Sequence, residues 1–65
     1  MPDVKLRIER GVVLPGLNEV KTWVFMVGKR RLMLECRYKS ALLVAKAEAR
    51  HQRRSEVYFL GSYKW

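Results

Sequence analysis

Hydrophobic and polar residues alternate at the start of the chain in the way that a strand requires. Within residues 4–10, apolar side chains alternate with charged ones, which is the period-two pattern of a half-buried strand. We expect this strand to continue through residues 11–14, with a bend or bulge at Gly11, until Pro15 and Gly16 break it.

Two further segments predict a hairpin with a basic turn. Residues 20–27 are apolar on both faces, which favours a central place in a sheet, whereas residues 32–39 alternate between apolar and polar. If residues 28–31 form the connection, Phe25 pairs with Leu34 and the large apolar side chains share one face. A shorter turn that shifts the pairing by two residues preserves the same faces, so the pattern allows both registers.

The periodicity becomes helical at Ser40. Ser40 is a favourable N-cap, and residues 41–54 are rich in strong helix formers and contain neither glycine nor proline. They predict a helix of about three to four turns. One stripe of this helix is small and apolar, which lets it approach a sheet closely: Ala41, Leu42, Ala45 and Ala49.

The last segment, residues 56–65, alternates again and predicts a strand that returns beside the sheet. The element order is then β-β-β-α-β. We therefore predict an α+β fold, in which a small antiparallel sheet of three to four strands carries one helix on one face. At 65 residues the chain forms a single domain, 1–65, near the lower size limit for a core without disulfides or metal.

Charge is the most informative feature of the composition. There are 14 lysine and arginine residues against 6 aspartate and glutamate residues, a formal net charge of +8. The isoelectric point of about 10.3 lies in the range of nucleic-acid-binding domains, although proteins that dock on membranes or on acidic partners share it. No apolar run is long enough to cross a bilayer, the start of the chain does not resemble a signal peptide, and Cys36 is the single cysteine. We expect a soluble cytoplasmic protein without a membrane partner.

The sequence predicts no catalytic residues. Cys36 falls on the core face of a strand and His51 near the end of the helix, where an ordinary buried cysteine and a solvated histidine are the simpler interpretation. The acidic residues are dispersed, the glycines are isolated, and four zinc ligands are not available. We therefore expect no enzyme activity, no metal and no cofactor.

Basic residues form the candidate binding site. Lys29, Arg30 and Arg31 fall at the tip of the hairpin, and Arg37 and Lys39 on the predicted outer face of the sheet, where they would follow a phosphate backbone. Met33 and Arg37 are the natural base readers. Basic turns also discourage edge-to-edge aggregation. A second group lies on the helix, where a merely solvated helix face is an equal interpretation: Lys46, Arg50, Arg53 and Arg54.

The aromatic residues divide into two groups. Trp23, Phe25, Tyr38 and Phe59 fall on the core-facing alternation and predict packing. Those near the end of the chain are less easily buried, and either stack on exposed bases or form a patch for a protein partner: Tyr58, Tyr63 and Trp65.

A set of positions within residues 9–51 matches a known arrangement: the segment ERGV at residues 9–12, Trp23, the turn Gly28-Lys29-Arg30, Tyr38, Ser40, Ala45 and Ala49. It resembles the plant ethylene-response-factor DNA-binding domain and the arm-binding domains of phage and transposon integrases. Those domains place three strands before one helix and read the major groove with the sheet. The resemblance implies that the turn residues Lys29 and Arg30, with Arg37 and Lys39 on the outer face, contact DNA.

A second resemblance concerns topology. From Lys21 onward, two strands, an alanine-rich helix and a closing strand at Glu56-Val57 are similar to small phage proteins that bind and inhibit host RNA polymerase. This resemblance implies function through protein contacts. The positive charge of the chain departs from the acidic members of that group.

These observations predict a small basic nucleic-acid-binding protein of phage or mobile-element type, acting in transcription or recombination. DNA is favoured as the partner, and RNA fits the charge equally well. The alternative is a non-enzymatic inhibitor that binds an acidic surface of a host protein such as RNA polymerase. A homodimer through the terminal strand would cover an exposed edge.

Overall fold

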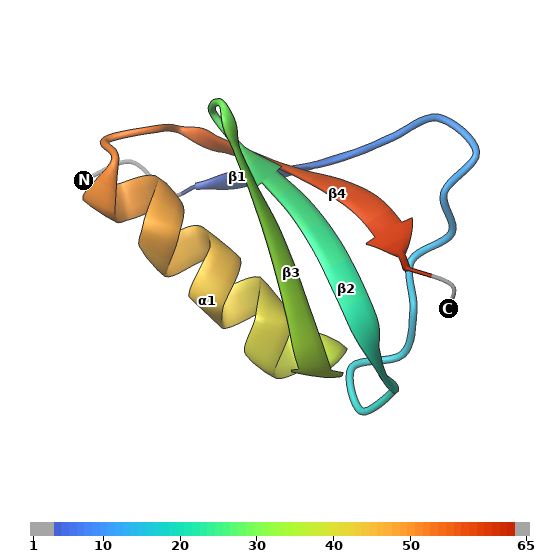
Figure 1. Ribbon diagram of the computed structural model, residues 1–65. Coiled ribbons are helices and arrows are strands. Elements are labelled where there is room, and N and C mark those ends of the chain that lie inside the picture. Colours follow the sequence, from blue (N-terminus) through green and yellow to red (C-terminus); the bar gives the residue numbers. More distant parts are fainter. Residues whose placement is uncertain (1–3, 64–65) are drawn as a thin grey trace.

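One helix packs across one face of a four-stranded sheet, as Figure 1 shows. The structure, a computed structural model, describes residues 4–63. The α+β class and the order β-β-β-α-β are confirmed. The elements are β1 (Lys5–Ile8), β2 (Val20–Val27), β3 (Arg30–Arg37), α1 (Tyr38–His51) and β4 (Glu56–Ser62).

The sheet is mixed, which corrects the expectation of an antiparallel one. Its strand order is β1-β4-β2-β3, and β2 is antiparallel to both of its neighbours. Strand β1 instead pairs in parallel with β4, with Leu6 beside Val57. The predicted continuation of the first strand is also wrong, because β1 ends at Ile8 and the chain turns at Gly11, whose φ is 87°. The following loop carries the chain past β4 to the start of β2 (Figure 1).

The hairpin adopts the shorter of the two expected turns. Val27 pairs with Arg30 and Phe25 with Leu32, so Gly28 and Lys29 alone connect the strands. Gly28 has a φ of 62°, which the first central position of a type II′ turn requires. The register is shifted by two from pairing Phe25 with Leu34, and the same side chains still face the core.

Helix α1 begins at Tyr38, two residues before the expected N-cap Ser40. The backbone carbonyls of Leu17 and Glu19 accept hydrogen bonds from the N–H groups of Lys39 and Tyr38, at 3.0 and 2.9 Å. The loop before β2 thus satisfies helix donors that a side-chain cap would otherwise satisfy. Ser40 therefore lies inside the first turn.

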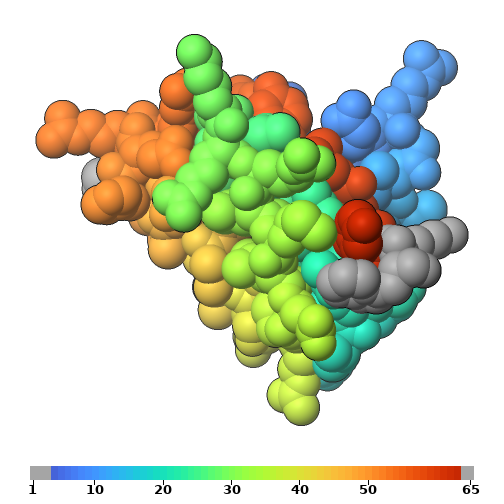
Figure 2. Space-filling view, in the orientation of Figure 1, coloured from blue at the N-terminus to red at the C-terminus, as the bar shows by residue number. Residues whose placement is uncertain are grey.

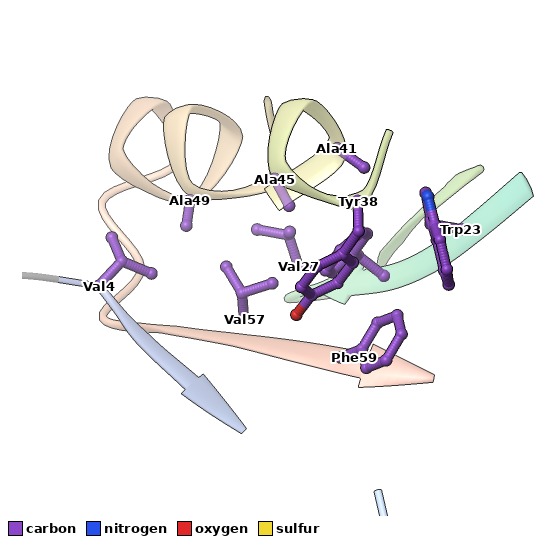
Figure 3. Close-up of a cluster of buried hydrophobic side chains, with 10 residues drawn as sticks. Val4, Trp23, Val27, Tyr38, Ala41, Ala45, Ala49, Val57 and Phe59 are labelled. Carbon is purple, nitrogen blue, oxygen red and sulfur yellow. The ribbon is translucent and has the colours of Figure 1, made fainter. Parts of the chain in front are cut away.

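The core lies between α1 and the sheet. Figure 3 shows Ala41, Ala45 and Ala49 directed from the helix toward Val57 and Phe59 of β4, and all of these residues are buried. The small alanine side chains allow close approach, so larger residues of the sheet fill the layer. Four rings contact one another at centroid distances between 5.1 and 6.2 Å: Trp23, Phe25, Tyr38 and Phe59.

Candidate nucleic-acid interface

The end of α1 brings Arg54 to the hairpin turn. The N–H of Arg53 donates to the carbonyl of Arg50 at 3.0 Å, and that of Arg54 donates to the carbonyl of Ala49 at 2.7 Å. This pair of bonds is a Schellman motif, with Arg53 in the left-handed conformation at a φ of 57°. The motif directs Arg54 against the turn. A β-carbon added to Gly28 would lie 2.9 Å from the Nε atom of Arg54, so the arginine side chain closely approaches this glycine.

A second contact joins the turn to the helix. Arg30 donates to the Oε1 atom of Glu48 at 3.3 Å, and Gln52 donates to the same oxygen at 2.9 Å. The hydrogen bond from Gln52 and the positive charge of Arg30 hold the pKa of Glu48 below its usual value. Glu48 therefore stays ionised at neutral pH and keeps Arg30 beside α1.

These contacts gather cations from distant parts of the chain at one end of the molecule. We call this group the basic end: Lys29, Arg30, Arg31, Arg53 and Arg54. Figure 2 shows the green side chains around residues 29–31 extending into solvent, near the orange atoms of the segment that follows α1. Within residues 4–63 a carboxylate pairs with Arg30, but no ion pair forms with Lys29, Arg31, Arg53 or Arg54. The basic end therefore carries a net positive charge.

The sheet face opposite α1 carries exposed side chains such as Met33 and Tyr58, although Thr22 on this face is buried, and we call it the outer face. Its positions alternate with the buried Phe25 and Val27 and form rows across the strands. In one row, Arg7 of β1 pairs with Tyr58 of β4. Tyr58 pairs in turn with Met26 of β2, whose other neighbour is Arg31 of β3. This row therefore places an arginine at each edge of the sheet and apolar surface between them.

Tyr58 is held in place by polar neighbours on this face. Its hydroxyl donates to the Oε2 atom of Glu56 at 3.2 Å, and Arg7 donates to the Oε1 atom of the same carboxylate at 3.3 Å. The hydrogen bonds from Arg7 and Tyr58 lower the pKa of Glu56, so the carboxylate is ionised at neutral pH. Tyr58 as a whole residue remains 44% exposed.

The expected binding residues fall into separate groups. Arg37 lies on the outer face of β3, as expected. Arg31, expected at the tip of the hairpin, belongs to β3 and lies on the same face, with Met33 and Glu35 between the two arginines. Lys39 does not lie on that face, because β3 ends at Arg37 and Lys39 belongs to the first turn of α1. Lys46 and Arg50 lie on α1, but the helix ends at His51, so Arg53 and Arg54 follow it instead of forming its last turn.

Three further residues differ in how they match the sequence-based expectations: Arg7, Tyr63 and Trp65. Arg7 is absent from the predicted binding residues, although its charged position in the alternation of β1 indicates the outer face. Tyr63 is exposed, while Trp65 lies outside the described residues.

The structure brings together neither the cysteine with the histidine nor a set of metal ligands. Cys36 lies just before α1 and His51 at its end, which separates them by the length of the helix, about 20 Å. Residues 4–63 hold no cluster of three or more histidine, cysteine or acidic side chains suited to a metal ion. In the same residues no helix has the length and apolarity to span a membrane.

Comparison with protein-family models, curated proteins and solved structures finds no match to the chain.

Proposed function

We propose that this protein binds nucleic acid through its basic end and the outer face of its sheet. The observation that carries the proposal is the contact between Arg54 and the turn at Gly28, which adds a cation from beyond the helix to those of the hairpin. Such convergence concentrates positive potential at one place, where lysine and arginine side chains neutralise phosphate groups and release the counterions condensed on the nucleic acid.

The outer face of β3 carries two cations, with the acidic Glu35 between them. Arg31 and Arg37 lie on the same side of β3, about 20 Å apart along the strand. Phosphate contacts at such positions fix the orientation of a nucleic acid, and side chains between them, such as Met33, reach bases. The sequence resemblances suggest regulation of transcription or recombination in a phage or mobile element as the biological setting.

Fluorescence-anisotropy titrations at several salt concentrations test the proposal. The probes are duplex DNA, single-stranded DNA and hairpin RNA, each with the purified protein. Replacing Lys29, Arg31 and Arg54 with alanine together should weaken binding to the preferred probe. The slope of log affinity against log salt should fall by about one unit for each phosphate group that the variant no longer neutralises.

A matched variant controls for total charge. Arg10, Lys21 and Lys39 are exposed and lie outside both the basic end and the outer face, so replacing them with alanine removes the same charge elsewhere. This control should keep most of the salt slope. Equal losses in the two triple variants would show that only net charge matters, and absence of binding to every probe would reject the proposal.

Exposed apolar residues on α1 favour one alternative, an acidic protein partner. Leu43 and Val44 are 62% and 48% exposed, and Lys39 and Lys46 belong to the same helix. Apolar anchors with lysines on the same helix suit an acidic docking surface on a host protein such as RNA polymerase. Replacing Leu43 with serine would weaken binding to such a partner and leave nucleic-acid affinity unchanged.

A further inference from the structure

We propose that the nucleic acid is bound as a single strand, with one base stacked on Tyr58 and a neighbouring phosphate held by Arg54. This inference rests on the proposed function and specifies its substrate class. It follows from three features of the outer face: an exposed and oriented ring, a hollow shared by that ring and an arginine, and the width of the sheet.

The ring of Tyr58 is suited to stacking because it is exposed and because its hydroxyl has a hydrogen-bond partner that favours one orientation. The hydrogen bond from its hydroxyl to Glu56 restrains it, and Glu56 is itself held by Arg7. Met26 adjoins Tyr58 on β2 and adds apolar surface beside the ring. Because the hydrogen bond already favours one orientation of the Tyr58 side chain, less of its conformational entropy is lost when a base stacks on the ring.

A shallow hollow at the surface joins this ring to the basic end. Its lining consists of Gly28, Arg54, Ser55, Glu56 and Tyr58. Arg54 forms no ion pair within residues 4–63, so its guanidinium is available to a phosphate oxygen. The carboxylate of Glu56 repels a phosphate but is already paired with Arg7. A nucleotide therefore fits with its base toward Tyr58 and its phosphate toward Arg54.

The breadth of the outer face disfavours a duplex in this position. Neighbouring strands lie about 4.8 Å apart, so the outermost strands of this four-stranded sheet are separated by about 14 Å before side chains are counted. The major groove of B-DNA is about 12 Å wide. Moreover, paired bases present their edges, whereas Tyr58 offers a flat ring that requires an exposed base face.

Binding to oligonucleotides with and without bases tests the inference. The probes are oligo-dT, oligo-U, an abasic strand of the same length and charge, and a duplex. Tyr58→Leu should lower affinity for oligo-dT or oligo-U by about 5- to 150-fold, the range for one base–aromatic stack. Tyr58→Phe should keep most of the affinity, and neither variant should change binding of the abasic strand. Circular dichroism confirms that each variant is folded.

The outcomes separate this inference from the proposed function. Two results would overturn the single-strand inference while nucleic-acid binding stands. One is salt-sensitive binding of the duplex with the same affinity as the single strands, and the other is an unchanged affinity of Tyr58→Leu for oligo-dT and oligo-U. Failure of all four probes to bind would overturn both. The difference between oligo-dT and oligo-U distinguishes DNA from RNA as the source of the strand.

Discussion

The hydroxyl of Tyr38 is buried in the core and has no hydrogen-bond partner among the described residues. An unpaired buried hydroxyl costs free energy, about 1–3 kcal/mol in mutational studies. We therefore expect Tyr38→Phe to be as stable as the parent chain or more stable, by up to about 1 kcal/mol. Urea denaturation followed by circular dichroism measures this difference. A large loss of stability in the variant would mean that the hydroxyl is hydrogen-bonded.

The same residue predicts how stability depends on alkaline pH. Burial raises the pKa of Tyr38 above its ordinary value of 10.0. Below pH 10 the phenol is protonated in both states, but above it the unfolded chain loses the proton first. Stability should therefore fall as the pH rises above 10, and the fall should be smaller in Tyr38→Phe. Parallel pH profiles for the two proteins would contradict this.

At the scale of elements, the two ends of α1 carry arginine where other residues cap helices better. Arg53 occupies the left-handed position of the Schellman motif. Glycine adopts this conformation without a steric cost because it has no side chain. Arg53→Gly should therefore stabilise the fold by about 0.5–1 kcal/mol, after allowance for the greater freedom of glycine in the unfolded chain. Arg53→Ala removes the same charge and keeps the strain, so it should give no such gain. Urea denaturation measures the stability of both variants, and a higher stability of Arg53→Ala than of Arg53→Gly would contradict this prediction.

The elements themselves were predictable from sequence, but their ends and partners were less so. Alternation placed Phe25 and Leu32 on one face, yet it left the register open by two residues because both turns preserve that face. The helix start was misplaced because the capping carbonyls come from Leu17 and Glu19, which are distant in sequence. The parallel pairing of β1 with β4 likewise depends on how the whole chain folds back.

For the whole molecule, composition indicated a basic surface but not its arrangement. The net charge of +8 is visible in the sequence, whereas the approach of Arg54 to Gly28 arises only when the helix end meets the hairpin. The row that joins Arg7, Tyr58 and Met26 depends in the same way on strand order. Local pattern thus identified the turn cations, and tertiary structure added the aromatic and arginine neighbours.

Arg37 connects the stability of the fold with its proposed activity. It is the N-cap of α1 and has extended φ and ψ, but its side chain makes no capping hydrogen bond within the described residues. An aspartate there would accept a bond from a free helix N–H and complement the helix dipole. Loop carbonyls already accept hydrogen bonds from part of this helix end, which limits the gain from a new cap. We therefore expect Arg37→Asp to stabilise the fold by about 0.5–1 kcal/mol.

The same substitution should weaken nucleic-acid binding if the bound strand extends along the outer face from the basic end to Arg37. It removes a cation that neutralises a phosphate and adds a repelling charge, so the salt slope should fall by about one unit. Arg37→Gln is the matched control, because glutamine removes the charge but is a poor cap, so it should weaken binding without raising stability. Urea denaturation and anisotropy titration of both variants separate the two effects. Unchanged affinity in both would confine the nucleic acid to the basic end, since a strand that reaches Arg37 must respond to the loss of its charge.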